Sequence, residues 1–99
     1  MKDRIEGRYE RSVEEVYNAA KYVLQQNGTL QEEMIIHQED ATVRAMDGRV
    51  NQRKIFIRVE PVDATVTSVV VQARTSGGGT DMNLAYELEK QIALRLVGS

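Results

Sequence analysis

The spacing of hydrophobic positions changes twice along the chain, and each change marks a predicted element. From Ser12 onward the apolar residues recur three and four positions apart, which is typical of one helix face. Ser12 and Glu15 fit an S-x-x-E capping box, and Asn27-Gly28 is typical of a left-handed C-cap. We predict a helix over 13–26 with an apolar face formed by Val13, Val16, Tyr17, Ala20, Val23 and Leu24.

Between Gly28 and Arg74 the hydrophobic period is two, as expected for strands with one buried face. In "KIFIRV" and "TVTSVVVQAR" alternate positions are apolar, and the stretch "RIEGRYER" ahead of the helix alternates in the same way. Pairing Val59 with Thr67, across a turn containing Pro61 and Asp63, places one apolar set on one side of the sheet. That set is Ile55, Ile57, Val59, Val69, Val71 and Ala73.

Two further strands flank the dipeptide 39–40. If this dipeptide is a two-residue turn, the apolar residues of both strands share one face. The dipeptide 47–48, Asp-Gly, is typical of a type I′ turn, but such a turn leaves that face out of phase with Ile55. We therefore expect a bulge at Gly48 or near Asn51. The residues brought together by the first turn are Met34, Ile36, Val43 and Ala45.

The last segment is again helical in period, with Thr80 or Asp81 as the predicted N-cap. Its apolar arc consists of Leu84, Ala85, Leu88, Ile92 and Leu96. The element order is β-α-β-β-β-β-α. We predict a single α+β domain over 1–99, a two-layer sandwich in which an antiparallel sheet of four to five strands carries both helices on one face.

Composition agrees with one small core: 99 residues, 41% hydrophobic and 28% charged, with a net charge of −2. Charge is patterned locally, because residues 32–40 contain four carboxylates and no lysine or arginine, whereas 41–60 contain five cations and two carboxylates. Cysteine is absent, which excludes a thiolate nucleophile and a cysteine-based zinc site. No window approaches the roughly 20 apolar residues of a membrane span, and the sequence as given shows no export signal.

The three consecutive glycines in "TSGGGTDM" raise the question of a phosphate-binding loop. A P-loop needs a lysine directly after its last glycine and a hydroxyl residue next, but Thr80 and Asp81 stand at these two positions. Asp81 would also place a carboxylate at the helix N-terminus, where a bound anion would sit. We interpret 77–79 as a connector between the last strand and the last helix.

His37 is the only histidine, and the predicted register points it away from the helices. A metal site or a catalytic triad would need partners that only Glu32, Glu33, Glu39 or Asp40 could supply, and their spacing matches no recognised motif. A solvated surface histidine is the better interpretation. We therefore predict no catalytic residue, no cofactor or metal, no small-molecule ligand, and no enzymatic activity.

The sheet face turned away from the helices is the most informative predicted surface. Five apolar residues on it suggest a surface for a second copy or another protein. Basic residues around the one phenylalanine favour an alternative partner, single-stranded nucleic acid. We expect this partner less, because the strands lack the octapeptide of glycine and aromatic residues that RNA-recognition strands carry. The interaction face comprises Ile35, Met46, Phe56, Val66 and Val70, and the alternative face comprises Arg44, Lys54, Phe56, Arg58 and Arg74.

Four stretches, in order and spacing, resemble a family of small bacterial lipoprotein-like domains of unknown function. They are "GRYERSVEEVYNAAKYVLQQNG", "ATVRAMDGRV", "KIFIRVEPVDATVTSVVVQAR" and "GGTDMNLAYELEKQI". The resemblance implies export to the periplasm or cell envelope and a lipid-modified cysteine upstream of the domain. It implies no catalytic residue. We accordingly expect a non-enzymatic envelope domain that acts through protein contacts on its open sheet face.

Overall fold

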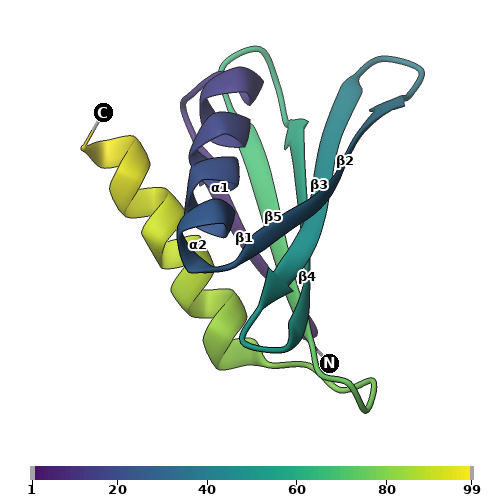
Figure 1. Cartoon of the computed structure of the whole chain (residues 1–99). Helices are drawn as coiled ribbons and strands as arrows, with labels where there is room; N and C mark the ends of the chain where they lie inside the picture. The colour runs from purple at the N-terminus through teal and green to yellow at the C-terminus, as the bar shows by residue number, and fades with distance from the viewer. Residues whose placement is uncertain (1, 99) are drawn as a thin grey trace.

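Five antiparallel strands form one sheet, and two helices pack on one of its faces (Figure 1). The computed structural model describes residues 2–98. The sheet order is β1-β5-β4-β3-β2, so β1 and β2 are the edges. The predicted α+β class and element order are confirmed. The elements are β1 (Ile5–Tyr9), α1 (Val13–Asn27), β2 (Thr29–His37), β3 (Thr42–Val50), β4 (Arg53–Pro61), β5 (Thr67–Arg74) and α2 (Met82–Val97).

Both helices begin at polar caps. The Ser12 hydroxyl accepts the Glu15 N–H at 3.1 Å, and the Glu15 carboxylate accepts the Ser12 N–H at 3.2 Å, so the predicted capping box is confirmed. At α2 the cap is Asp81, whose carboxylate accepts the Leu84 N–H at 3.0 Å. These side chains satisfy backbone donors that have no partner within the helix.

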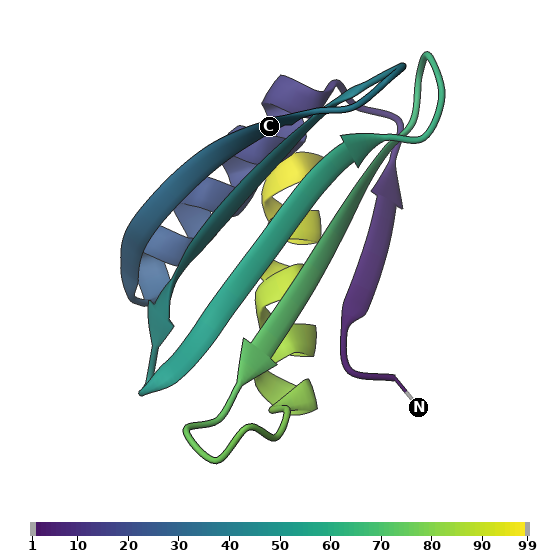
Figure 2. The same ribbon diagram turned by 90° about the vertical axis from the view of Figure 1, so that its right-hand side faces the viewer.

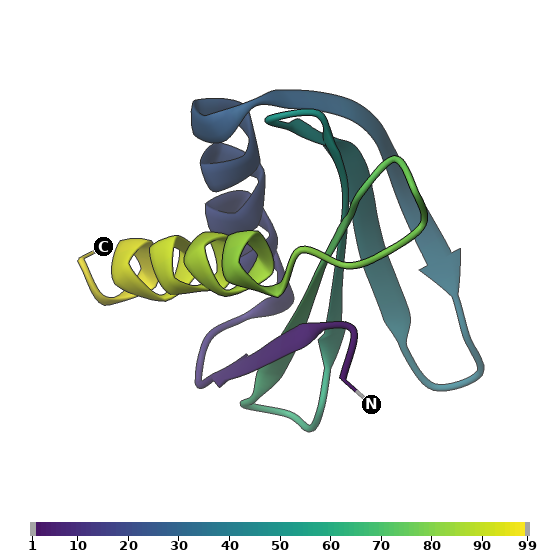
Figure 3. The ribbon, with the colours of Figure 1, turned by 90° about the horizontal axis from the view of Figure 1, so that it is seen from below.

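The core lies between the helices and one face of the sheet, and both helices reach it from the same side (Figure 3). Removal of these apolar side chains from water is the main force that holds the layers together. The predicted apolar faces of both helices are buried, apart from Val13 and Leu84, which are half-buried against the core. The largest fully buried side chains in this cluster are Tyr17, Leu24, Met46, Ile55, Ile57, Leu88 and Ile92.

Gly28 ends α1 for a reason other than the predicted left-handed cap. Its φ of −171° is extended backbone, so the prediction of a left-handed conformation is wrong. A Cβ at Gly28 would lie 1.9 Å from the Arg49 carbonyl oxygen, and a Cβ at Gly48 would lie 2.0 Å from the Thr29 carbonyl oxygen. The two glycines therefore let the end of α1 and the start of β2 press against the end of β3.

In two hairpins the side chains that were predicted to share one face of the sheet do share one. In the β2–β3 hairpin Ile36 pairs with Val43, and Gln38 donates to the Ala41 carbonyl at 2.9 Å, as a two-residue turn at 39–40 requires. In the β4–β5 hairpin Val59 pairs with Val69 rather than with Thr67. That shift of two residues leaves the same side chains on the helix side.

The register between β3 and β4 differs from the prediction. The turn is formed by Asn51 and Gln52, both with positive φ (49° and 66°), and Asp47 and Gly48 lie inside β3. No bulge separates β3 from β4, so Met46 pairs with Ile57 on the helix side. The bulge predicted at Gly48 or near Asn51 is absent. A bulge lies instead in β2, between residues 30 and 32.

As a consequence, the side chains of β2 and β3 that were predicted to face the helices point to the opposite side of the sheet. Met34, Ile36, Val43 and Ala45 lie on the face opposite the helices. Val43 is buried there, outside the core cluster that the helices cover. The physical reason is space: the helix side takes the large Met46 side chain, and it takes Gly48 where no side chain would fit.

Candidate interaction surface

The sheet face opposite the helices, here called the open face, is covered by no other element of residues 2–98 (Figure 2). The register of the ladder brings alternate side chains onto it. Ordered from β1 to β2, they are Glu6 and Arg8; Ser68, Val70, Gln72 and Arg74; Lys54, Phe56, Arg58 and Glu60; Val43, Ala45, Asp47 and Arg49; and Glu32, Met34 and Ile36.

The centre of the open face is apolar. A shallow groove of about 300 Å³ lies there, lined by Met34, Ala45, Phe56 and Val70 together with Arg4 and Gln72. Phe56 is 41% exposed and Met34 is 42% exposed, and both line the same groove, so their apolar surfaces form one patch. This apolar centre has the character of a contact surface.

Two of the five residues predicted for the interaction face lie on the open face: Phe56 and Val70. Met46 is buried in the core, and Ile35 lies on the helix side of β2, so their predicted exposure on the open face is wrong. Val66 precedes β5 in the loop that joins β4 to β5 and is half-buried. The sequence reading missed Met34 and Ala45, because it placed β2 and β3 in the opposite phase.

Three cations of the open face lie beside carboxylates. Lys54 Nζ lies 4.0 Å from Asp47, Arg58 Nε lies 3.4 Å from Glu60, and Arg74 lies 3.0 Å from Asp3. Arg44, the remaining member of the predicted nucleic-acid face, lies on the helix side. The open face is therefore close to neutral around Phe56, and a phosphate backbone approaching there would have to displace carboxylates.

Asp47 is the most deeply placed of these carboxylates, with 8% of its surface exposed. One of its oxygens is buried and accepts no hydrogen bond from residues 2–98. The cation nearest to it is Lys54, which also lies over the Phe56 ring at 5.6 Å. Lys54 is thus held between a carboxylate and an aromatic ring.

Charge is also separated along the strands. Arg49, Lys54 and Arg74 are neighbours on adjacent strands near the β3–β4 turn. At the opposite end of the strands, the loops 38–41 and 62–66 contain three carboxylates and no lysine or arginine. The open face therefore has a basic end and an acidic end.

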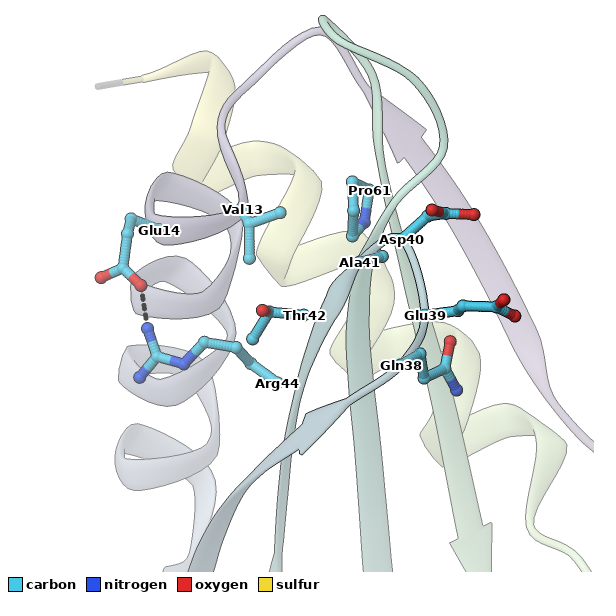
Figure 4. Close-up of a pocket in the computed structure, with 9 residues that line it drawn as sticks. All are labelled: Val13, Glu14, Gln38, Glu39, Asp40, Ala41, Thr42, Arg44 and Pro61. Atoms are coloured by element: carbon cyan, nitrogen blue, oxygen red, sulfur yellow. Dashed lines mark hydrogen bonds and ion pairs between the residues drawn. The ribbon is translucent and has the colours of Figure 1, made fainter.

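On the helix side a second cavity, of about 600 Å³, separates the N-terminal end of α1 from the β2–β3 hairpin (Figure 4). Arg44 extends across it from β3 to an ion pair with Glu14, whereas the carboxylates of Glu39 and Asp40 point away (Figure 4). The Arg44 guanidinium carbon lies 3.8 Å from the centre of the Tyr17 ring. This stacking joins the helix to the hairpin.

The Tyr17 hydroxyl donates a hydrogen bond of 2.5 Å to Glu33 of β2, and Lys21 lies 3.3 Å from the same carboxylate. Burial, followed by the neighbouring Glu33, raises the pKa of Tyr17 to about 12. The hydrogen bond from Tyr17, followed by Lys21, lowers the pKa of Glu33. Neither group changes charge near neutral pH, so the cluster fixes α1 to the hairpin and is poorly suited to proton transfer.

His37 pairs with Thr42 and lies on the helix side of β2, so its predicted orientation away from the helices is wrong. It is exposed. Within residues 2–98 no group of three histidine or carboxylate residues is arranged to hold a metal ion. Glu33, its predicted partner, is engaged by Tyr17.

The three glycines form a turn between β5 and α2. The Thr75 N–H donates to the Gly79 carbonyl at 3.0 Å, and Gly78 has a φ of +89°, which favours glycine. The N-terminus of α2 is occupied by the Asp81 carboxylate, which also pairs with Arg53 at 3.1 Å. The turn thus has the geometry of the predicted connector.

In the described part of the chain, no helix has the length and apolarity that crossing a membrane requires. Comparison of the chain with protein-family models, with curated proteins and with solved structures gave no match.

Proposed function

We propose that this chain is a protein-interaction domain without catalytic chemistry of its own, and that it binds its partner through the open face. One observation carries the proposal: a groove lined by exposed Phe56 and Met34 lies at the centre of a sheet face that no element of residues 2–98 covers. Exposed apolar area of this kind is stabilised when a partner removes it from water.

The arrangement of the open face supports this function. Apolar side chains lie at its centre and charged side chains around it, which is the anatomy of a protein interface. A central aromatic residue surrounded by a polar rim is also the usual position of a binding hot spot. Phe56 holds that position on β4, the middle strand of the sheet.

The alternative, a single-stranded nucleic-acid binder, has less support. It needs free cations around Phe56, but Lys54, Arg58 and Arg74 each lie beside a carboxylate.

We also propose that the protein is located in the bacterial envelope. This location rests on the resemblance to the lipoprotein-like domains.

The function can be tested by a photo-crosslinking amino acid placed at position 56 in cells that naturally produce the protein. The control carries the same amino acid at Tyr86, which is 58% exposed on α2. We expect covalent adducts to protein from position 56 and far fewer from position 86. Equal labelling at both positions, or adducts to nucleic acid alone from position 56, would contradict the proposed function.

A further inference from the structure

We propose that the partner on the open face is a second copy of this chain, packed face to face about a two-fold axis that runs across the strands at Ile57. This inference rests on the proposed function and names the partner of the same surface. The order of side chains on β4, the central strand of the sheet, supports this arrangement.

The outward side chains of β4 are self-complementary when the strand is reversed. They follow in the order Lys54, Phe56, Arg58 and Glu60. A two-fold axis across the strands at position 57 places Lys54 of one copy opposite Glu60 of the other, and Phe56 opposite Arg58. The first contact is an ion pair and the second is a cation–π contact. Both extend pairs already present in one copy, where Lys54 lies 4.0 Å from Asp47 and Arg58 lies 3.4 Å from Glu60, so the dimer brings a carboxylate to Lys54 and needs no carboxylate to be displaced.

The ends of the open face favour the same axis. The basic end contains Arg49, and the acidic end contains the carboxylates of loops 38–41 and 62–66. An axis across the strands brings the basic end of each copy toward the acidic end of the other. An axis along the strands would instead bring like charges together, which is unfavourable.

The area of the open face limits the affinity. Five strands spaced about 4.8 Å apart and roughly 20 Å long offer on the order of 500 Å² per copy, or about 1,000 Å² in total. That total is at the lower limit for a specific interface, so we expect a weak dimer.

Sedimentation equilibrium of the whole chain between about 10 μM and 1 mM tests the inference. We expect Lys54→Glu and Glu60→Lys each to weaken dimerisation by about tenfold, and the double variant to recover to within about threefold of the wild type. Phe56→Ser should abolish the dimer. Raising the salt concentration should weaken it, because the ion pair is partly exposed to solvent.

Lys90→Glu and Glu87→Lys serve as matched controls, since both residues are exposed on α2. They should leave the dimer unchanged. Thermal melts of every variant show whether the fold is retained, and Phe56→Ser provides a test even if Lys54→Glu unfolds beside buried Asp47. The inference is overturned by a strict monomer up to about 1 mM, by a dimer that Phe56→Ser does not affect, or by additive effects in the double variant.

The outcome separates this inference from the proposed function. Crosslinks from position 56 to a different protein, together with a monomer in sedimentation, would overturn self-association alone. A monomer in sedimentation together with no protein crosslink from position 56 would overturn both.

Discussion

Arg44 stacks on Tyr17 with its guanidinium carbon 3.8 Å from the ring centre, and this contact ties α1 to the β2–β3 hairpin. The same guanidinium pairs with Glu14, so one β3 side chain meets the helix at two points. It is only 23% exposed. A cation in this position is held by the aromatic face more strongly than by a surface ion pair.

We expect Arg44→Gln to lower the free energy of unfolding by about 1–2 kcal/mol, because the stacking contact and the ion pair are both lost. Arg49→Gln is the matched control: Arg49 lies on the same strand, is exposed and faces the other side of the sheet. Urea unfolding of both variants measures the difference. Equal losses would show that the Arg44 contacts add no stability.

Glu33 should make the stability of the protein depend on acid. Its pKa is lowered in the folded state, mainly by the Tyr17 hydroxyl, so its contribution is present above the ordinary value of 4.5 and is lost as pH falls through the folded pKa. We expect Glu33→Gln to be less stable than the wild type at neutral pH, and this deficit to be smaller at about pH 3, below the ordinary pKa of 4.5.

Urea unfolding at both pH values provides the measurement for Glu33→Gln. Glu32→Gln, an exposed neighbour on the same strand, is the control and should show no such convergence. A deficit in Glu33→Gln that persists unchanged in acid would refute the role of the ionised carboxylate.

Gly48→Ala should destabilise the protein by about 2 kcal/mol or more, because the new Cβ would meet the Thr29 carbonyl oxygen at 2.0 Å. Gly77→Ala should be close to neutral, since a Cβ added there would have no neighbouring atom within 4 Å and the φ of Gly77 is not left-handed. Thermal melts distinguish the two variants. If Gly48→Ala melts like the wild type, the backbone of β3 at Gly48 must lie farther from the Thr29 carbonyl oxygen of β2 than in this structure.

Ser12→Ala should cost on the order of 1 kcal/mol, because it removes the hydroxyl that caps α1. Ser76→Ala, in the exposed turn before the glycines, supplies the comparison. The measurement is the midpoint of thermal unfolding. An unchanged midpoint in Ser12→Ala would show that the capping box contributes little.

Local patterns in the sequence predict most of the fold. The spacing of Val16 and Leu24, the capping box at Ser12 and the alternation around Ile57 each report a periodicity or a hydrogen bond made by near neighbours. Those elements, and Phe56 on the open face, follow from the sequence alone.

The phase of β3 could not be read in this way. Apolar residues occupy both of its faces, with Val43 and Ala45 on one and Met46 on the other, so alternation gives no preference. The Asp47-Gly48 pair also suggests a turn, although the turn is made by Asn51 and Gln52. The deciding contact is long-range: a side chain at Gly48 would meet the Thr29 carbonyl oxygen of the neighbouring strand, and no local pattern records it.

An NMR dilution series of the labelled protein, from about 1 mM to 20 μM, tests the proposed interaction most directly. We predict concentration-dependent amide shifts at Phe56, Arg58 and Val70, with the exposed side of α2 around Tyr86 unchanged. Shifts confined to the helices, or spectra that do not change on dilution, would contradict self-association through the open face.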